Sequence, residues 1–328
     1  MIISRAPFRI SFTGGGSDMV EFYKHSPGAV ISTSIDKYMY LTLHQYFDFE
    51  KIHLKYSKSE LVSKYSQIKH PIFRTVLKET GINGVEISSV ADIPSGTGLG
   101  SSSAFTVALW HCLSAFQKKS ISKIELAEKA CYTEIDLLRE PIGKQDQYAT
   151  AFGGLNFIYF DPSGKVEIDK LSISDTRVKE LEGKLMMFYT GISRYSKNVL
   201  SEQKKNIISS HRKFKSLELM VKMTFELREC IENGSLDDMG EILNRSWLEK
   251  KSLASNISNP IVDHYYNLAI QHGGALGGKL LGAGNGGFLL FYVHKEKQEK
   301  LKKVLCELRE FDFKFSDHGT EIIFNEEL

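Results

Sequence analysis

The sequence has few cysteines and no long uninterrupted apolar run. Its 328 residues include four cysteines, and no two of them form a Cys-x-x-Cys pair. This argues against a disulfide framework or a zinc site and is typical of a reducing compartment. Apolar runs of membrane-spanning length are missing, and charge comes too early in the first residues for a signal peptide. We therefore expect a cytoplasmic protein.

The chain also lacks a strong charge of one sign. Its formal net charge is +2, which gives no general attraction to nucleic acid or to membrane surfaces. The 42% hydrophobic and 25% charged residues are ordinary for a globular protein, and the length suits one large or two medium domains. There is no Pro/Ser-rich linker and no internal repeat.

Strand and helix patterns are mixed along the chain. Alternation and short apolar runs predict strands over residues 8–12, 29–34, 38–44, 85–90, 154–160, 185–190 and 288–293. An apolar run after residue 100 predicts a buried helix, and Ser122 with Glu125 forms a capping box for a helix to about Arg139. Three helical stretches over 195–254, a charged helix over 296–309 and a closing strand follow. This order predicts an α+β fold with two domains that meet near residue 180.

The segment Pro94–Ala104 (PSGTGLGSSSA) is the most informative part of the chain. Gly96, Gly98 and Gly100 let the backbone turn tightly and approach a ligand, and three serines then open the apolar helix. A glycine loop before a helix N-terminus predicts an anion site, most naturally for a nucleotide phosphate. The loop has neither the Gly-Lys-Ser/Thr ending of a Walker A loop nor the spacing of the dinucleotide fingerprint. The alternative is a plain connection whose serines cap the helix.

Two further segments give this loop a context. Residues 5–18 (RAPFRISFTGGGSD) and 279–287 (KLLGAGNGG) flank it in the sequence, and together the three motifs bracket nearly the whole chain. They resemble, in order, the N-terminal, central and C-terminal motifs of the GHMP kinases. The resemblance implies a two-domain GHMP kinase fold. Residues 1–180 would form the ATP-binding N-terminal domain, ribosomal-S5-like and α/β, and residues 181–328 a ferredoxin-like α+β domain.

The resemblance also implies roles for individual residues. Asp146 lies in a Gly-x-x-Asp-Gln stretch like that of galactokinases and would be the catalytic base, with Arg9 stabilising the developing alkoxide. Glu134 and Ser102 match the residues that hold Mg²⁺ beside ATP. The simpler alternatives are a helix cap for Asp146, a surface arginine on a strand for Arg9 and a solvent-facing carboxylate for Glu134. The residues expected to bind ATP are Pro94, Gly96, Gly98, Leu99, Gly100, Ser101, Ser102 and Ser103.

The acceptor site differs from that of galactokinases. Residues 14–18 read Gly-Gly-Gly-Ser-Asp where galactokinases have bulkier and acidic side chains, which leaves room for a phosphorylated sugar. This pattern looks most like the D-glycero-D-manno-heptose 7-phosphate kinase branch, which phosphorylates the C1 hydroxyl on the way to nucleotide-activated heptose for surface glycans. A basic pocket would then hold the 7-phosphate, with Lys144 and Arg194 as the first candidates. Lys250 and Lys251 are further candidates, although a solvated surface charge is the better interpretation of both. The residues expected to bind the substrate are Gly15, Gly16, Ser17, Asp18, Lys144, Arg194 and Gly284.

Two alternatives to the heptose kinase remain open from the sequence. One is another sugar 1-kinase, of the fucose or galactose type, which would share the catalytic residues. The other is a non-catalytic regulator that binds ATP and sugar, against which the presence of Asp146, Glu134 and Arg9 argues. The expected partner is a small sugar phosphate, without nucleic acid or membrane, and a homodimer is left open.

Overall fold

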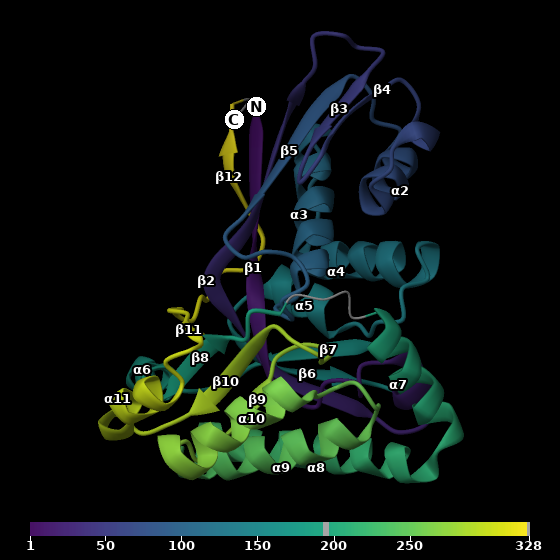
Figure 1. The fold of residues 1–328 in the computed structure, drawn as a ribbon. Helices are drawn as coiled ribbons and strands as arrows, with labels where there is room; N and C mark the ends of the chain where they lie inside the picture. Colours follow the sequence, from purple (N-terminus) through teal and green to yellow (C-terminus); the bar gives the residue numbers. More distant parts are fainter. Residues whose placement is uncertain (193–196, 327–328) are drawn as a thin grey trace.

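The computed structural model describes residues 1–192 and 197–326 and consists of two β-sheets with helices packed on them (Figure 1). The larger sheet has eight strands, in the order β12-β1-β2-β5-β3-β4, with β6 on the first part of β2 and β7 on β6. Its strands are β1 (Ile2–Thr13), β2 (Gly28–Gln45), β3 (Ile52–Lys55), β4 (Ser59–Val62), β5 (Val85–Ala91), β6 (Leu155–Phe160), β7 (Val166–Lys170) and β12 (Glu321–Asn325). The smaller sheet, ordered β11-β8-β10-β9, contains β8 (Leu185–Tyr189), β9 (Gly277–Leu280), β10 (Phe288–Tyr292) and β11 (Arg309–Glu310).

The helices predicted from the sequence are present, together with further helices that were not predicted. The α-helices are α1 (Val20–Tyr23), α2 (Pro71–Thr80), α3 (Ser101–Phe116), α4 (Lys123–Cys131), α5 (Gln145–Phe152), α6 (Asp175–Glu182), α7 (Lys197–Ser209), α8 (His211–Glu232), α9 (Asp238–Ser252), α10 (Pro260–Leu268) and α11 (Lys295–Val304). A 3-10 turn (Tyr65–Gln67) and two π-helical turns (Tyr132–Leu137 and Ala269–Gly273) complete the described elements. The capping box of Ser122 and Glu125 is confirmed, and the helix that it opens passes into the first π-helical turn.

The main correction concerns the two strands predicted over 29–34 and 38–44, which are one long strand, β2. Its first part pairs with β6 and its second part with β5, while β1 runs antiparallel to both parts. The register of β1 on β2 shifts between Pro7 and Arg9, where residues 35–37 face Phe8. Such a bulge bends a strand and redirects neighbouring side chains, and Arg9 follows it directly.

The C-terminal strand crosses from one half of the chain to the other. β12 pairs with β1, and the amino group of Met1 lies 2.7 Å from a carboxylate oxygen of Glu326, so the two ends of the chain lie side by side (Figure 1). The sheets therefore divide between β7 and β8, near the predicted boundary at residue 180, with β12 returning to the first sheet. The division of the chain into domains 1–180 and 181–328 itself stays a prediction.

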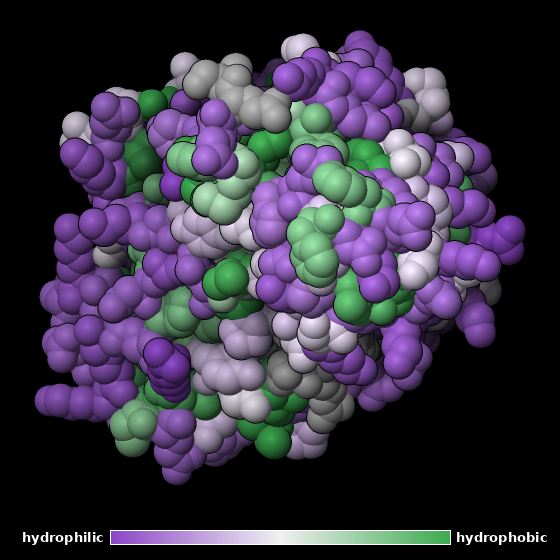
Figure 2. Space-filling model, turned by 90° about the horizontal axis from the view of Figure 1, so that it is seen from above, coloured by the Kyte–Doolittle hydropathy of each residue, from purple (hydrophilic) through white to green (hydrophobic). Residues whose placement is uncertain are grey.

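Helix α3 fills the space behind the first sheet. It is apolar on all sides, with eleven of its sixteen residues buried, and the hydroxyl of Ser4 on β1 donates to the carbonyl of Ala108 on α3. On the face seen in Figure 2, hydrophilic side chains predominate and apolar ones are scattered among them. Of the helices in residues 1–192 and 197–326, none is long and apolar enough to cross a membrane.

Candidate active site

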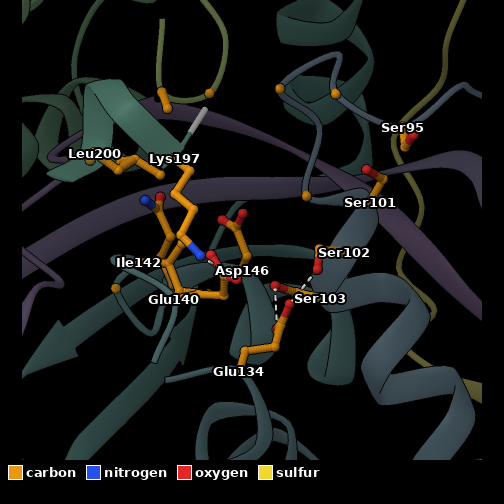
Figure 3. A pocket seen from close by; sticks show the side chains of 18 of the residues that line it. Ser95, Ser101, Ser102, Ser103, Glu134, Glu140, Ile142, Asp146, Lys197 and Leu200 are labelled. Atoms are coloured by element: carbon orange, nitrogen blue, oxygen red, sulfur yellow. Dashed lines mark hydrogen bonds and ion pairs between the residues drawn. The ribbon is translucent and has the colours of Figure 1, made fainter. Parts of the chain in front are cut away.

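A pocket of about 750 Å³ lies where the two halves of the chain meet. Its lining comes from the glycine loop and α3, from β1 and the turn that follows it, and from α7, α9 and the segment after β9. Lys197 and Glu140 both line it and form an ion pair at 3.0 Å (Figure 3). The volume lies in the range of small-molecule sites, and the pocket brings together all three motifs found in the sequence.

The glycine loop is built as an anion site. Gly96, Gly98 and Gly100 all have positive φ, between 77° and 86°, a conformation that other residues rarely adopt. Gly100 directly precedes α3, so the first turn of this sixteen-residue helix presents its free N–H groups at the pocket. Gly96, Gly98, Gly100 and Ser101–Ser103 line the pocket, whereas Leu99 is fully buried. The backbone N–H of Arg9 donates to Leu99, which joins the loop to β1.

The C-terminal glycine segment packs directly on this loop. A Cβ on Gly98 would collide with the carbonyl oxygen of Leu281, and one on Gly287 would collide with the carbonyl oxygen of Thr97. Asn285 has φ +68° and is held in this turn by Asn259, whose side-chain amide donates to the Asn285 carbonyl. The contact explains the glycines on both segments, because only backbone without side chains can approach so closely.

Asp146 and Arg9 form a two-fold ion pair at the end of the glycine loop. Arg9 Nε and Nη2 donate to the two carboxylate oxygens at 2.7 and 2.6 Å, and Nη1 donates to the carbonyl of Gly98. A Cβ on Gly100 would lie 3.4 Å from Asp146 Oδ2. Arg9 is 3% exposed and Asp146 lies in the first turn of α5, so neither the surface arginine nor the plain helix cap describes the structure.

Glu134 lies deeper, under the first turn of α3, and is 1% exposed. Its carboxylate accepts hydrogen bonds from Ser102 Oγ at 2.5 Å and Ser103 Oγ at 2.9 Å (Figure 3). A third hydrogen bond comes from Gln147 Nε2 at 2.7 Å. Burial raises the pKa of Glu134 to about 7, and the charge of Asp146 adds to this, while the three hydrogen bonds act in the opposite direction. The solvent-facing alternative is therefore excluded.

Asp18 joins the turn after β1 to the start of α5. Its carboxylate accepts from the backbone N–H of Gly16 at 2.8 Å and from the backbone and side-chain nitrogens of Gln145 at 3.1 and 3.3 Å. Burial raises the pKa of this carboxyl above its usual value, whereas the N–H groups lower it. Gly15, Gly16, Asp18 and Gly284 all line the pocket, so these expected substrate contacts are within reach of a ligand.

Several expected contacts take other positions. The Ser17 hydroxyl bonds to the backbone of Ala29 instead of the pocket, and the amine of Lys144 donates to the carbonyl of Gly164 and lies over the Tyr23 ring. Neither residue lines the pocket, nor does Pro94. Arg194 lies outside the described residues. The solvated position preferred for Lys250 is wrong, because the residue is buried and lines the pocket, and its amine donates to the carbonyl of Gly15.

The residues at the far end of the pocket, beyond Ser95 and Gly96, were not predicted from the sequence. Rings from three segments meet there: Tyr56, His70 and Phe105, with ring centroids 4.9 to 5.0 Å apart for the two pairs that involve His70. Met39 and Ile72 line the same pocket. These residues share no sequence spacing, so only the fold could bring them together.

Comparison with known protein families identifies the family to which the chain belongs. Residues 66–154 match the model of the GHMP kinases N terminal domain, and residues 227–311 match that of the GHMP kinases C terminal domain, together more than half of the chain. The chain belongs to the GHMP kinases. As a GHMP kinase it is an ATP-dependent phosphotransferase that acts on an alcohol, and the two-domain, mixed α+β fold is confirmed.

The relatives of this GHMP kinase include enzymes for several acceptors. D-glycero-alpha-D-manno-heptose 7-phosphate kinase from Campylobacter jejuni is 28% identical over 98% of both chains. L-fucokinase/L-fucose-1-P guanylyltransferase from Bacteroides fragilis is 26% identical over 98% of this chain and 38% of its own length. Among solved structures, a D-glycero-D-manno-heptose 1-phosphate kinase from Bacteroides thetaiotaomicron superposes with a TM-score of 0.81 at 21% identity over 99% of both chains.

Proposed function

We propose that this kinase transfers the γ-phosphoryl group of ATP to the C1 hydroxyl of D-glycero-D-manno-heptose 7-phosphate and forms the 1,7-bisphosphate. One observation carries the chemistry: the Arg9–Asp146 pair lies against Gly100, where the glycine loop meets the N-terminus of α3. A γ-phosphate bound at this helix end would therefore lie beside a carboxylate and a guanidinium. The sugar specificity is supported by the Campylobacter relative and by Gly15 and Gly16, which line the pocket without side chains. The room expected at Gly14 and Gly16 is not there, because a Cβ on either would collide with Ala29 or Gln203.

The proposed reaction needs one proton acceptor and one electrostatic stabiliser. Asp146 accepts the proton of the C1 hydroxyl, the oxygen attacks the γ-phosphorus, and the bond from that phosphorus to the β-phosphate oxygen breaks to release ADP. Each oxygen of Asp146 accepts one hydrogen bond from Arg9 and keeps a second lone pair for the proton. Arg9 stabilises the charge that develops on the attacking oxygen.

The donors around Glu134 fit a magnesium ion bound together with ATP. Mg²⁺ favours hard oxygen ligands and takes few of them from the protein, and Glu134 and Ser102 offer a carboxylate and a hydroxyl that line the same pocket. Within residues 1–192 and 197–326 there is no group of three or more His, Cys, Asp or Glu side chains that could hold a metal ion. When bound, the ion would neutralise charge on the phosphates.

The far end of the pocket would receive the adenine. Tyr56, His70 and Phe105 offer apolar ring surface beyond the glycine loop, and burial lowers the pKa of His70, so that its ring is neutral near pH 7. The triphosphate would then run along residues 95–103 toward Asp146. The acceptor sugar would occupy the opposite end, between the Gly14–Asp18 turn and α9.

An ADP-release assay with a panel of sugars tests the proposal. The panel contains D-glycero-D-manno-heptose 7-phosphate, the free heptose, L-fucose, D-galactose and D-mannose 6-phosphate, and phosphorus NMR identifies the phosphorylated position. We expect the highest kcat/KM with the heptose 7-phosphate and a new phosphate on C1. A higher kcat/KM with a free sugar would replace the heptose proposal by a fucose- or galactose-type 1-kinase. ATP binding without ADP release on any sugar would point to the regulator.

A further inference from the structure

Two buried lysines face the acceptor end of the pocket. Lys250 on α9 is 7% exposed and Lys279 on β9 is 9% exposed, and both line the cavity. The Lys250 amine donates to the carbonyl of Gly15 and to Gln203 Oε1, each at 3.0 Å. The Lys279 amine donates to the carbonyls of Ser11 and Phe12 at 2.8 and 3.0 Å. An ammonium group has three protons, so one proton of each amine has no protein acceptor among these bonds.

The positive charge of this pair is not balanced by the protein. Among the described residues, no carboxylate lies within ion-pair distance of either amine. Asp18 acts on Lys250 through space, but its oxygens already accept N–H groups from Gly16 and Gln145. Burial lowers the pKa of Lys250 to about 8 and that of Lys279 to about 7, and Lys279 is lowered further by Lys250 and Arg9. An anionic ligand would relieve this unfavourable arrangement.

Nearby polar groups also lack partners. Ser11 and Trp247 line the same end of the pocket, and within the described part of the chain the Ser11 hydroxyl and the Trp247 indole nitrogen are buried without a hydrogen-bond partner. Such buried donors are uncommon in folded proteins and often mark a position that a ligand completes. Together with the two lysines they supply donors to the pocket, while the side-chain oxygen of Gln145, which also lines it, is a buried acceptor without a partner among the described residues.

We propose that Lys250 and Lys279 form the site that holds the phosphate group which the sugar substrate already carries. This inference rests on the proposed function and adds a subsite to it. Along β1 the carbonyls that hold Lys279 follow Arg9 by two and three residues, about 7–10 Å in an extended strand. The carbonyl that holds Lys250 lies further along, at Gly15. A sugar with C1 at Asp146 would thus extend its far end toward the two amines.

From the sequence, Lys250 was only a further candidate for the phosphate, with a solvated position preferred, and Lys279 was not a candidate. Lys144 was expected to contact the phosphate because it is a neighbour of Asp146 in the sequence, but its amine is engaged by Gly164 and it does not line the pocket. Lys250 lies more than a hundred residues from Asp146 in the sequence and approaches the acceptor end only because α9 packs beside the Gly14–Asp18 turn.

The test compares a phosphorylated sugar with its unphosphorylated counterpart. For the wild type, Lys250→Met, Lys250→Arg and the control Lys251→Met, kcat/KM is measured with heptose 7-phosphate and with free heptose. We expect Lys250→Met to lower the ratio of the two values by about 10- to 100-fold, as for the loss of a hydrogen bond to a charged group. Lys250→Arg should recover most of the ratio. Lys251→Met should leave it unchanged, because Lys251 is partly exposed and pairs with Asp263.

A second measurement does not depend on the folding of a variant. Wild-type enzyme is acetylated with a limiting amine reagent, with and without each sugar, and the modified peptides are quantified by mass spectrometry. Heptose 7-phosphate should protect Lys250 and Lys279, free heptose should protect them less, and Lys251 should react equally in all samples. Equal protection by both sugars, or an unchanged ratio in Lys250→Met, would overturn the phosphate site. The proposed function would still stand if the wild type has the higher kcat/KM with the 7-phosphate. A higher kcat/KM of the wild type with free heptose would contradict both the phosphate site and the proposed function.

Discussion

Two carboxylates of the same pocket have opposite surroundings. Asp146 is held by the two nitrogens of a guanidinium and is partly open to the cavity, whereas Glu134 is fully buried and is held only by two hydroxyls and an amide. Asp146 thus has its charge balanced within the protein. Among residues 1–192 and 197–326, Glu134 has hydrogen-bond donors but no cation, and burial raises its pKa to about 7. Environments that differ in this way are how a site assigns different roles to like groups.

The difference between the two sites shows which partner each carboxylate lacks. Asp146 needs no further cation and has free lone pairs directed at the acceptor end, which suits a proton acceptor. Glu134 lacks a positive partner, which a divalent cation brought in with ATP would supply. Substitutions that remove one charge at a time should therefore have different consequences at the two positions, in turnover at the first and in stability at the second.

Replacement of Asp146 should have the largest effect. Asp146→Asn keeps the shape and the contact with Arg9 Nη2 but removes the proton acceptor, so we expect kcat to fall by about 10³-fold or more. The Kd for ATP should change little, because the glycine loop and α3 are untouched. Steady-state ADP release and calorimetric ATP titration measure the two quantities. Asp136→Asn, at an exposed position two residues after Glu134, is the matched control. Turnover close to wild type in Asp146→Asn would refute the base.

The glycine loop offers the next test, because both carboxylates are placed against it. Gly98→Ala puts a Cβ onto the Leu281 carbonyl at a residue with φ +86°, and we expect the loop to shift and the Kd for ATP to rise by about 10- to 100-fold. Gly81→Ala is the control, since it has a similar φ of +68° but open space around it. Calorimetric titration with ATP compares the two. Unchanged ATP affinity in Gly98→Ala would remove the proposed phosphate loop.

A structural feature could be predicted from the sequence where its cause lies within one segment of the chain. The glycine loop and α3 were predictable, because glycine spacing and a long apolar run act within one segment. The joining of two predicted strands into β2 was not, because contacts distant in the sequence carry the strand past residues 35–37. These contacts are the pairing with β1 on both sides and the bridge between Ile35 and Phe315. A solvated position was preferred for Lys250 for the same reason, since the carbonyl that accepts from its amine belongs to the distant Gly15. The positions of Asp146 and Glu134 came from a family resemblance, while their contrasting surroundings came from the fold.

The smallest of these effects tests the unpaired carboxylate. Glu134→Gln keeps the side chain's shape and removes a buried charge, so the variant without metal or nucleotide should be more stable than the wild type at pH 8 by about 1–3 kcal/mol. Below pH 4.5 the carboxyl is protonated in both the folded and the unfolded wild type, and the difference should vanish. Between pH 4.5 and about 7 the unfolded chain loses this proton before the folded one does, so the wild type loses stability relative to the variant as pH rises.

Chemical denaturation at pH 4.5, 6 and 8 measures this difference, with Glu128→Gln on an exposed position of α4 as the control. The order should reverse when Mg²⁺ and ATP are added at pH 8, because binding to the folded state stabilises the wild type and the variant has lost the carboxylate that the ion needs. A Glu134→Gln variant that is less stable than the wild type at pH 8 without ligands would show that the carboxylate serves the fold. The contrast between the two carboxylates would then be one of structure and not of function.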